Sequence, residues 1–260
     1  MKKLFALVLA LALIASFGVA SAATKLVVGA SSTPHAEILE AAKPLLEEKG
    51  IELEIVIFDD YVQPNLQLES GDLDANYFQH IPYLEDFNAS NGTHLVSAGA
   101  VHYEPMGIYA GKSSDLANIP DGATIAVPND TTNESRALAL LQAQGIITLS
   151  AEAGQTATAL DIAENPHNIE IVEVEAAQVP RQLADVDFGV INSNYALQAG
   201  PDVVGTAIAV EGTEVAYPNI VAIREGDDRE ELKTLVEVLQ SDAIVNFITE
   251  TYGTAVVPTK

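Results

Sequence analysis

Arg136 is a cation at a position where a helix is expected to begin. It lies in the segment PNDTTNESRALALLQ, in which Thr131 and Glu134 have the spacing of a capping box, the side-chain pair that closes a helix N-terminus. Apolar residues at helical spacing follow, and Gly145 is expected to end the helix. The first turn of a helix already presents partial positive charge, so a cation there costs up to about 1 kcal/mol unless an anion lies nearby. The sequence therefore indicates an anion near Arg136.

Two kinds of anion would meet this need. One is a carboxylate of the same segment, Glu134 or Asp130, in a surface ion pair of the common and weak kind. The other is a ligand, because the planar guanidinium group binds carboxylates and phosphates through two parallel hydrogen bonds, and helix N-termini bind anions. The residues themselves leave both interpretations open.

A second segment, DANYFQHIPYL, is rich in aromatic residues in a chain that is only 6% aromatic; they are Tyr77, Phe78, His80 and Tyr83. Phe78 and His80 have the alternation of a strand and would project to the same face. An aromatic wall with one imidazole suits an apolar ligand side chain, and for a thioether each sulfur–aromatic contact contributes about 0.3–1.5 kcal/mol. Tyr61, in the segment DDYVQPN, could add a third face. The alternative is a core strand, followed by a helix, whose tyrosines serve packing alone.

Two asparagines stand at strand ends. Asn192 follows the apolar run at residues 188–191, and Asn219 directly precedes the run at residues 220–223. Amides in such positions commonly close turns. If they instead face a carboxylate bound by Arg136, they could orient an α-amino acid.

The sequence gives little support for catalysis. It contains no cysteine and none of the motifs GxSxG, GxxxxGK[ST] or HExxH. We therefore expect a binding protein rather than an enzyme, with no cofactor and no metal. The five histidines lack metal-ligand spacing in sequence, but they could converge on a metal in space; they are His35, His80, His94, His102 and His167.

The 260-residue chain is strongly acidic, with a formal net charge of −25. Such a charge disfavours nucleic acid and anionic membrane surfaces as partners. Lys2 and Lys3, an apolar run at residues 4–19 and the small residues up to Ala22 have the pattern of a signal peptide spanning residues 1–22. We expect an exported monomer, periplasmic or secreted and soluble, because no lipobox cysteine is present to carry a lipid.

Short apolar strands alternate with helical stretches along the rest of the chain. Strands are expected at residues 26–30, 52–58, 95–101, 108–110, 124–127, 169–174, 188–191 and 220–223. Helices are expected at residues 35–49, with a kink or early break at Pro44, and at residues 62–69 and 228–240. This order predicts two mostly parallel α/β sheets with helices on both faces. Ligands of such sheets bind beyond the carboxyl ends of the strands, where the polar segments above are placed.

Five segments together resemble a known family; in order, they are DDYVQPN, GDLDANYFQHIPYL, IAVPNDTTNESRAL, ENPHNIEIVEVEAAQVPR and GVINSNYA. They resemble the methionine-binding solute-binding proteins of bacterial ABC importers, the MetQ/NlpA lipoprotein family, over most of the chain. The resemblance implies a type II periplasmic-binding-protein fold, in which two doubly wound lobes close on a ligand between them. Lobe 1 would comprise residues 23–107 and 222–260, and lobe 2 residues 108–221, with crossings near residues 106–110 and 219–223.

The resemblance also implies a role for each candidate residue. Arg136 would bind the ligand carboxylate, Asn192 and Asn219 would bind the amino-acid backbone, and the thioether would be enclosed by Tyr61, Phe78 and His80. The implied function is capture of L-methionine, or also D-methionine, and its delivery to a membrane permease driven by a cytoplasmic ATPase. The alternative ligands are a methionine-containing dipeptide or another apolar amino acid.

Two features depart from the family pattern. Family members are usually lipidated at an N-terminal cysteine, which this sequence lacks. The family segment NDPTN reads NDTTN here, so that Thr131 stands where the proline is expected. Losing the proline changes the stiffness of the loop beside Arg136, which bears on affinity and ligand choice.

Overall fold

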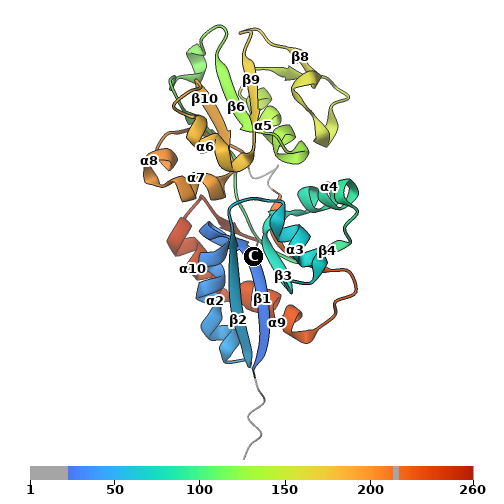
Figure 1. The fold of residues 1–260 in the computed structure, drawn as a ribbon. Helices are drawn as coiled ribbons and strands as arrows, with labels where there is room; N and C mark the ends of the chain where they lie inside the picture. Colours follow the sequence, from blue (N-terminus) through green and yellow to red (C-terminus); the bar gives the residue numbers. More distant parts are fainter. Residues whose placement is uncertain (1–22, 213–216, 260) are drawn as a thin grey trace, which may run out of the picture.

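The chain folds into two lobes, each built on a β-sheet with helices packed against it (Figure 1). The computed structural model describes residues 23–212 and 217–259, so the predicted signal peptide lies outside the described residues. Within the described ranges, no helix is both long enough and apolar enough to cross a membrane.

The first lobe contains a six-stranded sheet in the order β13-β4-β12-β3-β1-β2. Its strands are β1 Thr24–Ser31, β2 Ile51–Phe58, β3 Ala75–His80, β4 Leu95–Tyr103, β12 Pro218–Arg224 and β13 Val257–Pro258. β1 runs parallel to β2 and β3, whereas β12 is antiparallel to β3 and β4, and β13 is antiparallel to β4.

The second lobe contains a five-stranded sheet in the order β11-β5-β10-β6-β9. Its strands are β5 Gly107–Ala110, β6 Thr124–Pro128, β9 Glu170–Val174, β10 Phe188–Ile191 and β11 Ala207–Val210, and a small hairpin is formed by β7 Thr148–Leu149 and β8 Ile162–Glu164. β6 is parallel to β9 and β10, whereas β5 is antiparallel to β10 and β11. The prediction of mostly parallel sheets is therefore wrong. Each sheet is parallel on one side and antiparallel on the other, because strands that enter from the opposite lobe run the other way.

The predicted strands are all present within a few residues of their expected bounds, and the helices largely agree. The helices of the first lobe are η1 Ser32–Ala36, α2 Glu37–Glu47, α3 Gln63–Ser70, α4 Ile81–Asn91, α9 Glu230–Leu239 and α10 Asp242–Tyr252. Those of the second lobe are η2 Leu116–Asn118, α5 Thr131–Ala143, η3 Gly154–Thr156, η4 Ala159–Asp161, η5 Ala176–Gln178, α6 Val179–Gln182, α7 Ser193–Ala199 and α8 Pro201–Val204. Of the kink or early break expected at Pro44, the early break does not occur, since α2 continues through Pro44 to Glu47, and the kink stays a prediction.

Each lobe has its own apolar core. In the first lobe, β1 and α2 bury Leu26, Ile38 and Leu39 completely. In the second, β6 and α5 bury Ile125 and Leu138 completely. Each sheet packs against its own helices. The segments between the two cores therefore link the lobes.

The chain passes between the two sheets twice. It leaves the first sheet between β4 and β5, at residues 104–106, and returns between β11 and β12, at residues 211–217. The crossings expected at residues 106–110 and 219–223 are misplaced, since β5 and β12 each lie within a single sheet. The domain boundaries at 107/108 and 221/222 stay predictions. The first connection contributes Glu104 to the cavity described next.

Candidate functional site

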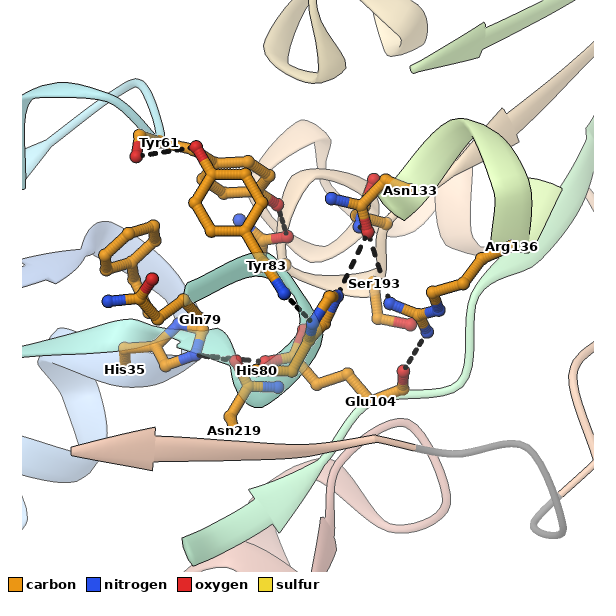
Figure 2. Close-up of a pocket in the computed structure, with 13 residues that line it drawn as sticks. His35, Tyr61, Gln79, His80, Tyr83, Glu104, Asn133, Arg136, Ser193 and Asn219 are labelled. Carbon is orange, nitrogen blue, oxygen red and sulfur yellow. Dashed lines mark hydrogen bonds and ion pairs between the residues drawn. The ribbon is translucent and has the colours of Figure 1, made fainter. Parts of the chain in front are cut away.

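A cavity between the two lobes brings together all six residues singled out in the sequence (Figure 2). It encloses about 360 Å³ of empty space including its open mouth. Its described lining is His35, Tyr61, Phe78, Gln79, His80, Tyr83, Glu104, Asn133, Arg136, Asn192, Ser193, Asn194 and Asn219. Both lobes and the first connection contribute, so a bound molecule would touch both sides of the cleft.

The ends of strands place these side chains. His80 is the last residue of β3, and Asn192 directly follows β10, while Asn133 and Arg136 lie in the first turns of α5, just beyond the end of β6. These strand ends meet at the edge of the sheets that faces the other lobe, as expected for ligand sites of open α/β sheets. The positions of His80, Asn192 and Arg136 near strand ends therefore predicted this part of the cavity lining correctly.

The start of α5 is closed by Asp130, not by Thr131. The Asp130 carboxylate accepts a hydrogen bond from the Asn133 backbone N–H at 3.1 Å and from the Asn133 side chain at 2.9 and 3.0 Å. Glu134 points elsewhere, since its Oε1 accepts a hydrogen bond from the Ala159 backbone N–H. The predicted capping box is therefore wrong, because aspartate caps a helix at least as well as threonine and stands one residue earlier.

Arg136 meets its anion within the protein. Its guanidinium forms a two-pronged pair with Glu211, with Nε to Oε1 at 3.1 Å and Nη2 to Oε2 at 2.5 Å, and both side chains are buried. The predicted ion pair exists, but its partner is neither Glu134 nor Asp130. Glu211 follows β11 and lies 75 residues away in sequence, so only the fold brings it to α5.

One nitrogen of Arg136 faces the cavity without a carboxylate. Nη1 donates to Asn133 Oδ1 at 3.3 Å, a long hydrogen bond to a neutral acceptor, while Nη2 also donates to the Glu104 carbonyl oxygen at 3.3 Å. Asn133 Oδ1 accepts a second hydrogen bond, at 2.8 Å, from the side chain of Asn192. Arg136 therefore keeps donor capacity on Nη1 for an anion in the cavity.

Aromatic rings form one wall of the cavity. The Tyr61 ring lies 5.7 Å from that of Phe78, 5.8 Å from Tyr83 and 5.0 Å from Tyr195, measured between centroids. The Tyr61 hydroxyl donates to Asn194 Oδ1 at 2.7 Å, and the Tyr83 hydroxyl donates to the Tyr61 carbonyl oxygen at 2.9 Å. Since the hydroxyls are engaged with protein groups, the ring faces are what the wall offers to a ligand.

His80 closes this wall as a neutral ring. Its Nδ1 accepts a hydrogen bond from the Tyr83 backbone N–H at 3.1 Å, which caps α4. Burial, with a further contribution from the positive charge of Arg136, lowers the pKa of His80 to about 3. The imidazole therefore adds a polar but uncharged edge to the aromatic surface.

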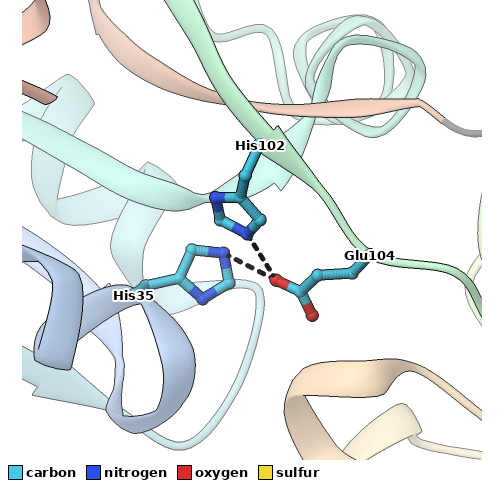
Figure 3. Close-up of side chains that lie close together, drawn as sticks. All are labelled: His35, His102 and Glu104. Carbon is cyan, nitrogen blue, oxygen red and sulfur yellow. Dashed lines mark hydrogen bonds and ion pairs between the residues drawn. The ribbon is translucent and has the colours of Figure 1, made fainter. Parts of the chain in front are cut away.

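Two histidines contact the same carboxylate oxygen of Glu104 (Figure 3). Its Oε1 lies 2.8 Å from His102 Nε2 and 3.3 Å from His35 Nε2. His35 Nε2 also lies 3.2 Å from the Oδ1 of Asn219. Burial raises the pKa of Glu104, opposed by His35 and Arg136, and burial lowers the pKa of His35 to about 4 and that of His102 to about 3.

These three side chains could in principle hold a metal ion, since their ligand atoms lie within 4.8 Å of one another. Histidines distant in sequence do converge here, as the sequence allowed. However, His35 Nε2 sits between two oxygen acceptors, which requires that it carry a hydrogen and leaves it no lone pair for a metal. The arrangement is therefore better described as a carboxylate held by two neutral N–H donors.

Several buried polar atoms of the lining have no partner among the described residues: Asn192 Oδ1, Asn194 Nδ2 and His35 Nδ1. Unpaired buried groups are uncommon and costly, so they indicate a missing partner. The lining thus has two unpaired acceptors, Asn192 Oδ1 and His35 Nδ1, and one unpaired donor, Asn194 Nδ2, together with Arg136 Nη1, a carboxylate and an aromatic wall. That combination fits a small zwitterion with an apolar side chain.

Two residues of the cavity lining, Glu104 and Asn133, were not predicted from the sequence. Glu104 follows β4, and the rule of polar residues after strands could have found it, had the strand been extended to Tyr103. Asn133 precedes Arg136 by three residues, a spacing that places two side chains on one helix face. By contrast, no local signal marks Glu211.

Comparisons with known proteins agree with this geometry. The profile of the NlpA lipoprotein family matches residues 26–260. The chain is 43% identical over 247 residues to the methionine-binding lipoprotein MetQ of Bacillus subtilis, covering 93% of this chain and 90% of that protein. It is 42% identical over 212 residues to the D-methionine-binding lipoprotein MetQ of Escherichia coli K12, covering 80% of this chain and 78% of that protein.

A solved structure is also similar in fold. It is a nutrient-binding protein from Burkholderia cenocepacia bound to methionine, with a TM-score of 0.87 and 44% sequence identity. The likeness covers 90% of this chain and all of that chain. The two-lobed α/β architecture is therefore shared with a protein whose structure holds an amino acid.

Glu211→Gln is expected to lower the free energy of unfolding by about 3–5 kcal/mol, because it leaves the buried Arg136 charge without a charged partner. Chemical denaturation at neutral pH measures the change. Glu152→Gln, which neutralises an exposed carboxylate of the same lobe, serves as the control. Equal stability of the two variants would show that the pair contributes nothing.

Glu134→Gln is expected to make stability less dependent on pH. Burial, and then the nearby Glu173, raise the pKa of Glu134 to about 7. A carboxyl with a raised folded-state pKa contributes stability that is complete below its ordinary pKa and is lost as the pH rises through 7. Between pH 5 and 8 the wild type should lose about 1–3 kcal/mol more than the variant, measured by denaturant titration. Parallel pH profiles would contradict this assignment.

Proposed function

The chain belongs to the NlpA lipoprotein family, and we propose that it is the solute-binding component of an ABC importer that captures methionine between its lobes. The observation that carries the proposal is the cavity between the lobes, which combines three features: an arginine N–H group without a carboxylate partner, a buried carboxylate and an aromatic wall. These three match the carboxylate, the ammonium group and the thioether of methionine.

The ligand carboxylate is assigned to the side of Arg136. Nη1 is the guanidinium nitrogen that lacks a carboxylate partner among the described residues, and the unpaired Nδ2 of Asn194 supplies a further donor in the same lining. Because Glu211 already balances Arg136, this end of the cavity is close to neutral before the ligand arrives. Binding of the ligand carboxylate here depends on oriented hydrogen-bond donors more than on net positive charge.

The ligand ammonium is assigned to Glu104, with Asn192 Oδ1 as an unpaired acceptor. Asn219 is placed beside this end, but its Oδ1 already accepts a hydrogen bond from His35. Family resemblance implies that Asn219 contacts the amino-acid backbone of the ligand. We propose that Asn219 also holds His35 in place. An ammonium group beside Glu104 would pair the carboxylate whose burial is otherwise costly.

The thioether is assigned to the wall formed by Tyr61, Phe78, Tyr83 and His80. Its rings lie at angles to one another, and sulfur binds favourably at aromatic edges and faces at about 0.3–1.5 kcal/mol per contact. The ring of His80 is neutral, so it adds no charge that would disfavour an apolar side chain.

Transport follows from capture by both lobes. A ligand touching Arg136 on one lobe and Phe78 on the other favours the closed arrangement by its contacts to both. We propose that the closed form delivers methionine to a membrane permease driven by a cytoplasmic ATPase, without chemical change to the ligand. The family role supports these partners, and the names of the relatives describe binding proteins.

We place the protein outside the cytoplasmic membrane. The supports are the signal-peptide pattern of residues 1–22 and the relatives, which are named lipoproteins. Those names do not support the prediction of a freely soluble protein, which rests only on the absence of cysteine from the 260 residues. The monomeric state likewise stays a prediction.

A ligand panel tests the proposed function. Protein freed of carried-over ligand by denaturation and refolding is heated with each amino acid and with several methionine dipeptides. Ligand at 100 times its dissociation constant should add about 2.7 kcal/mol, which raises the unfolding midpoint by a few degrees. A shift with L- or D-methionine is expected. A shift only with a dipeptide or another apolar amino acid would change the assigned ligand, and no shift at all would contradict the function.

The role of Arg136 requires a paired variant, because Arg136→Ala alone would leave Glu211 buried without its partner. The double change Arg136→Gln with Glu211→Gln removes both charges and should weaken methionine binding at least tenfold, about 1.4 kcal/mol. Glu211→Gln alone keeps the guanidinium and should retain binding. Calorimetric titration measures both, and equal affinity in the two variants would refute the assignment.

A further inference from the structure

Beneath the cavity lies a chain of buried side chains that no ligand contact explains. Tyr77 and His102 are both fully buried, and neither is among the described residues that line the cavity. The Tyr77 hydroxyl is hydrogen-bonded to His102 Nδ1, and His102 Nε2 lies 2.8 Å from Glu104 Oε1. Tyr77 belongs to β3 and His102 to β4, whereas Glu104 lies on the first connection between the lobes.

The positions of the hydrogens between Tyr77, His102 and Glu104 follow from the protonation states of these side chains. Burial keeps the Tyr77 hydroxyl protonated, raising its pKa well above the ordinary value, and it keeps His102 neutral. A neutral imidazole has one N–H and one acceptor nitrogen. If Nδ1 carried the hydrogen, a bare Nε2 would face the Glu104 carboxylate and repel it. Tyr77 therefore donates to Nδ1, and Nε2 carries the hydrogen that is donated to Glu104.

His35, in η1, is the second histidine that contacts the Glu104 carboxylate. Its Nε2 hydrogen lies between Glu104 Oε1 and Asn219 Oδ1, at 3.3 and 3.2 Å. The same carboxylate oxygen thus accepts from two imidazoles, and the second oxygen of Glu104 points away from both rings (Figure 3). Two donors on one oxygen define the rotation of the carboxylate.

We propose that Tyr77, His102 and His35 are positioning residues for amine recognition: they orient Glu104 so that one oxygen is held by the protein and the other meets the α-ammonium group of the ligand. The proposal rests on the proposed function and deepens it. In this proposal, the Glu104 end of the cavity selects ligands by their amine. An analogue that lacks the amine therefore gains no affinity from the hydrogen bonds of Tyr77, His102 and His35.

The test compares two ligands in two variants of His102. The ligands are L-methionine and its desamino analogue 4-(methylthio)butanoate. Asparagine places its amide near Nδ1, so His102→Asn keeps the contact with Tyr77 and loses the donor to Glu104, whereas His102→Gln places its amide near Nε2 and restores that donor. His102→Asn is expected to weaken methionine binding at least tenfold and to leave binding of the analogue within about threefold. His102→Gln should recover most of the loss.

Tyr77→Phe gives a milder test that preserves the ring. Removing the hydroxyl frees Nδ1 to take the hydrogen, and methionine affinity should fall by about 3–10-fold with the analogue unaffected. The desamino analogue is the internal control, because it lacks the amine that the oriented carboxylate of Glu104 would meet. Equal losses for both ligands in these variants, or no loss, would overturn the proposal.

The pH profile adds a readout that packing alone would not move. Around Glu104 the titratable and charged groups are His35, His102, Arg136, Tyr61, Tyr77, Tyr109 and Tyr252. Methionine affinity should fall as the pH is lowered and Glu104 takes up a proton. In His102→Asn this loss should begin at higher pH, because the missing N–H had favoured the charged carboxylate. Identical profiles would overturn the proposal.

The outcomes separate this proposal from the function on which it rests. A wild-type protein that binds no methionine overturns both. A wild type that binds methionine, with variants that show unchanged selectivity between methionine and its desamino analogue, overturns only the positioning role.

Discussion

The burial of charge is the constraint on which the cleft depends. Arg136, Glu104 and Glu211 are each at most 9% exposed, and a buried charge is tolerated only with a partner. The protein itself supplies those partners: Glu211 pairs with Arg136, and Glu104 is held by two histidine N–H groups and the Asn194 backbone N–H. In the proposed function, recognition uses the groups that remain, namely one guanidinium nitrogen and one carboxylate oxygen.

The same residues connect recognition to the linkage between lobes. Glu104 lies on the first connection and Glu211 on the second, and the two connections are joined directly. The Met106 backbone N–H donates to Glu211 Oε2 at 2.7 Å, and the Glu211 backbone N–H donates to the Met106 carbonyl at 2.8 Å. Because Arg136 also donates to the Glu104 carbonyl, any shift of its guanidinium toward a ligand acts on both connections. In the proposed function, these contacts would link ligand binding to movement of the lobes.

Much of the fold was predictable from local pattern, since each apolar run at residues 26–30, 124–127 or 188–191 has the length and composition of a buried strand. The direction of pairing was not, because a strand such as β12 reads the same whether it lies parallel or antiparallel to its neighbour. The helix at Arg136 was predicted in place, but its cap was assigned to Thr131 rather than Asp130, since both residue types can cap and only geometry separates them.

Residue types and their local spacing were enough to indicate two α/β sheets, a binding role, and six side chains that share one cavity. These properties are written in short segments, because a strand end and the polar residues after it are neighbours in sequence. What faces them is not local. The partner of Arg136 lies 75 residues away, and the histidine donors that hold Glu104 come from two other elements. Only the tertiary structure decided which charges are already paired, and hence which atoms are left for a ligand.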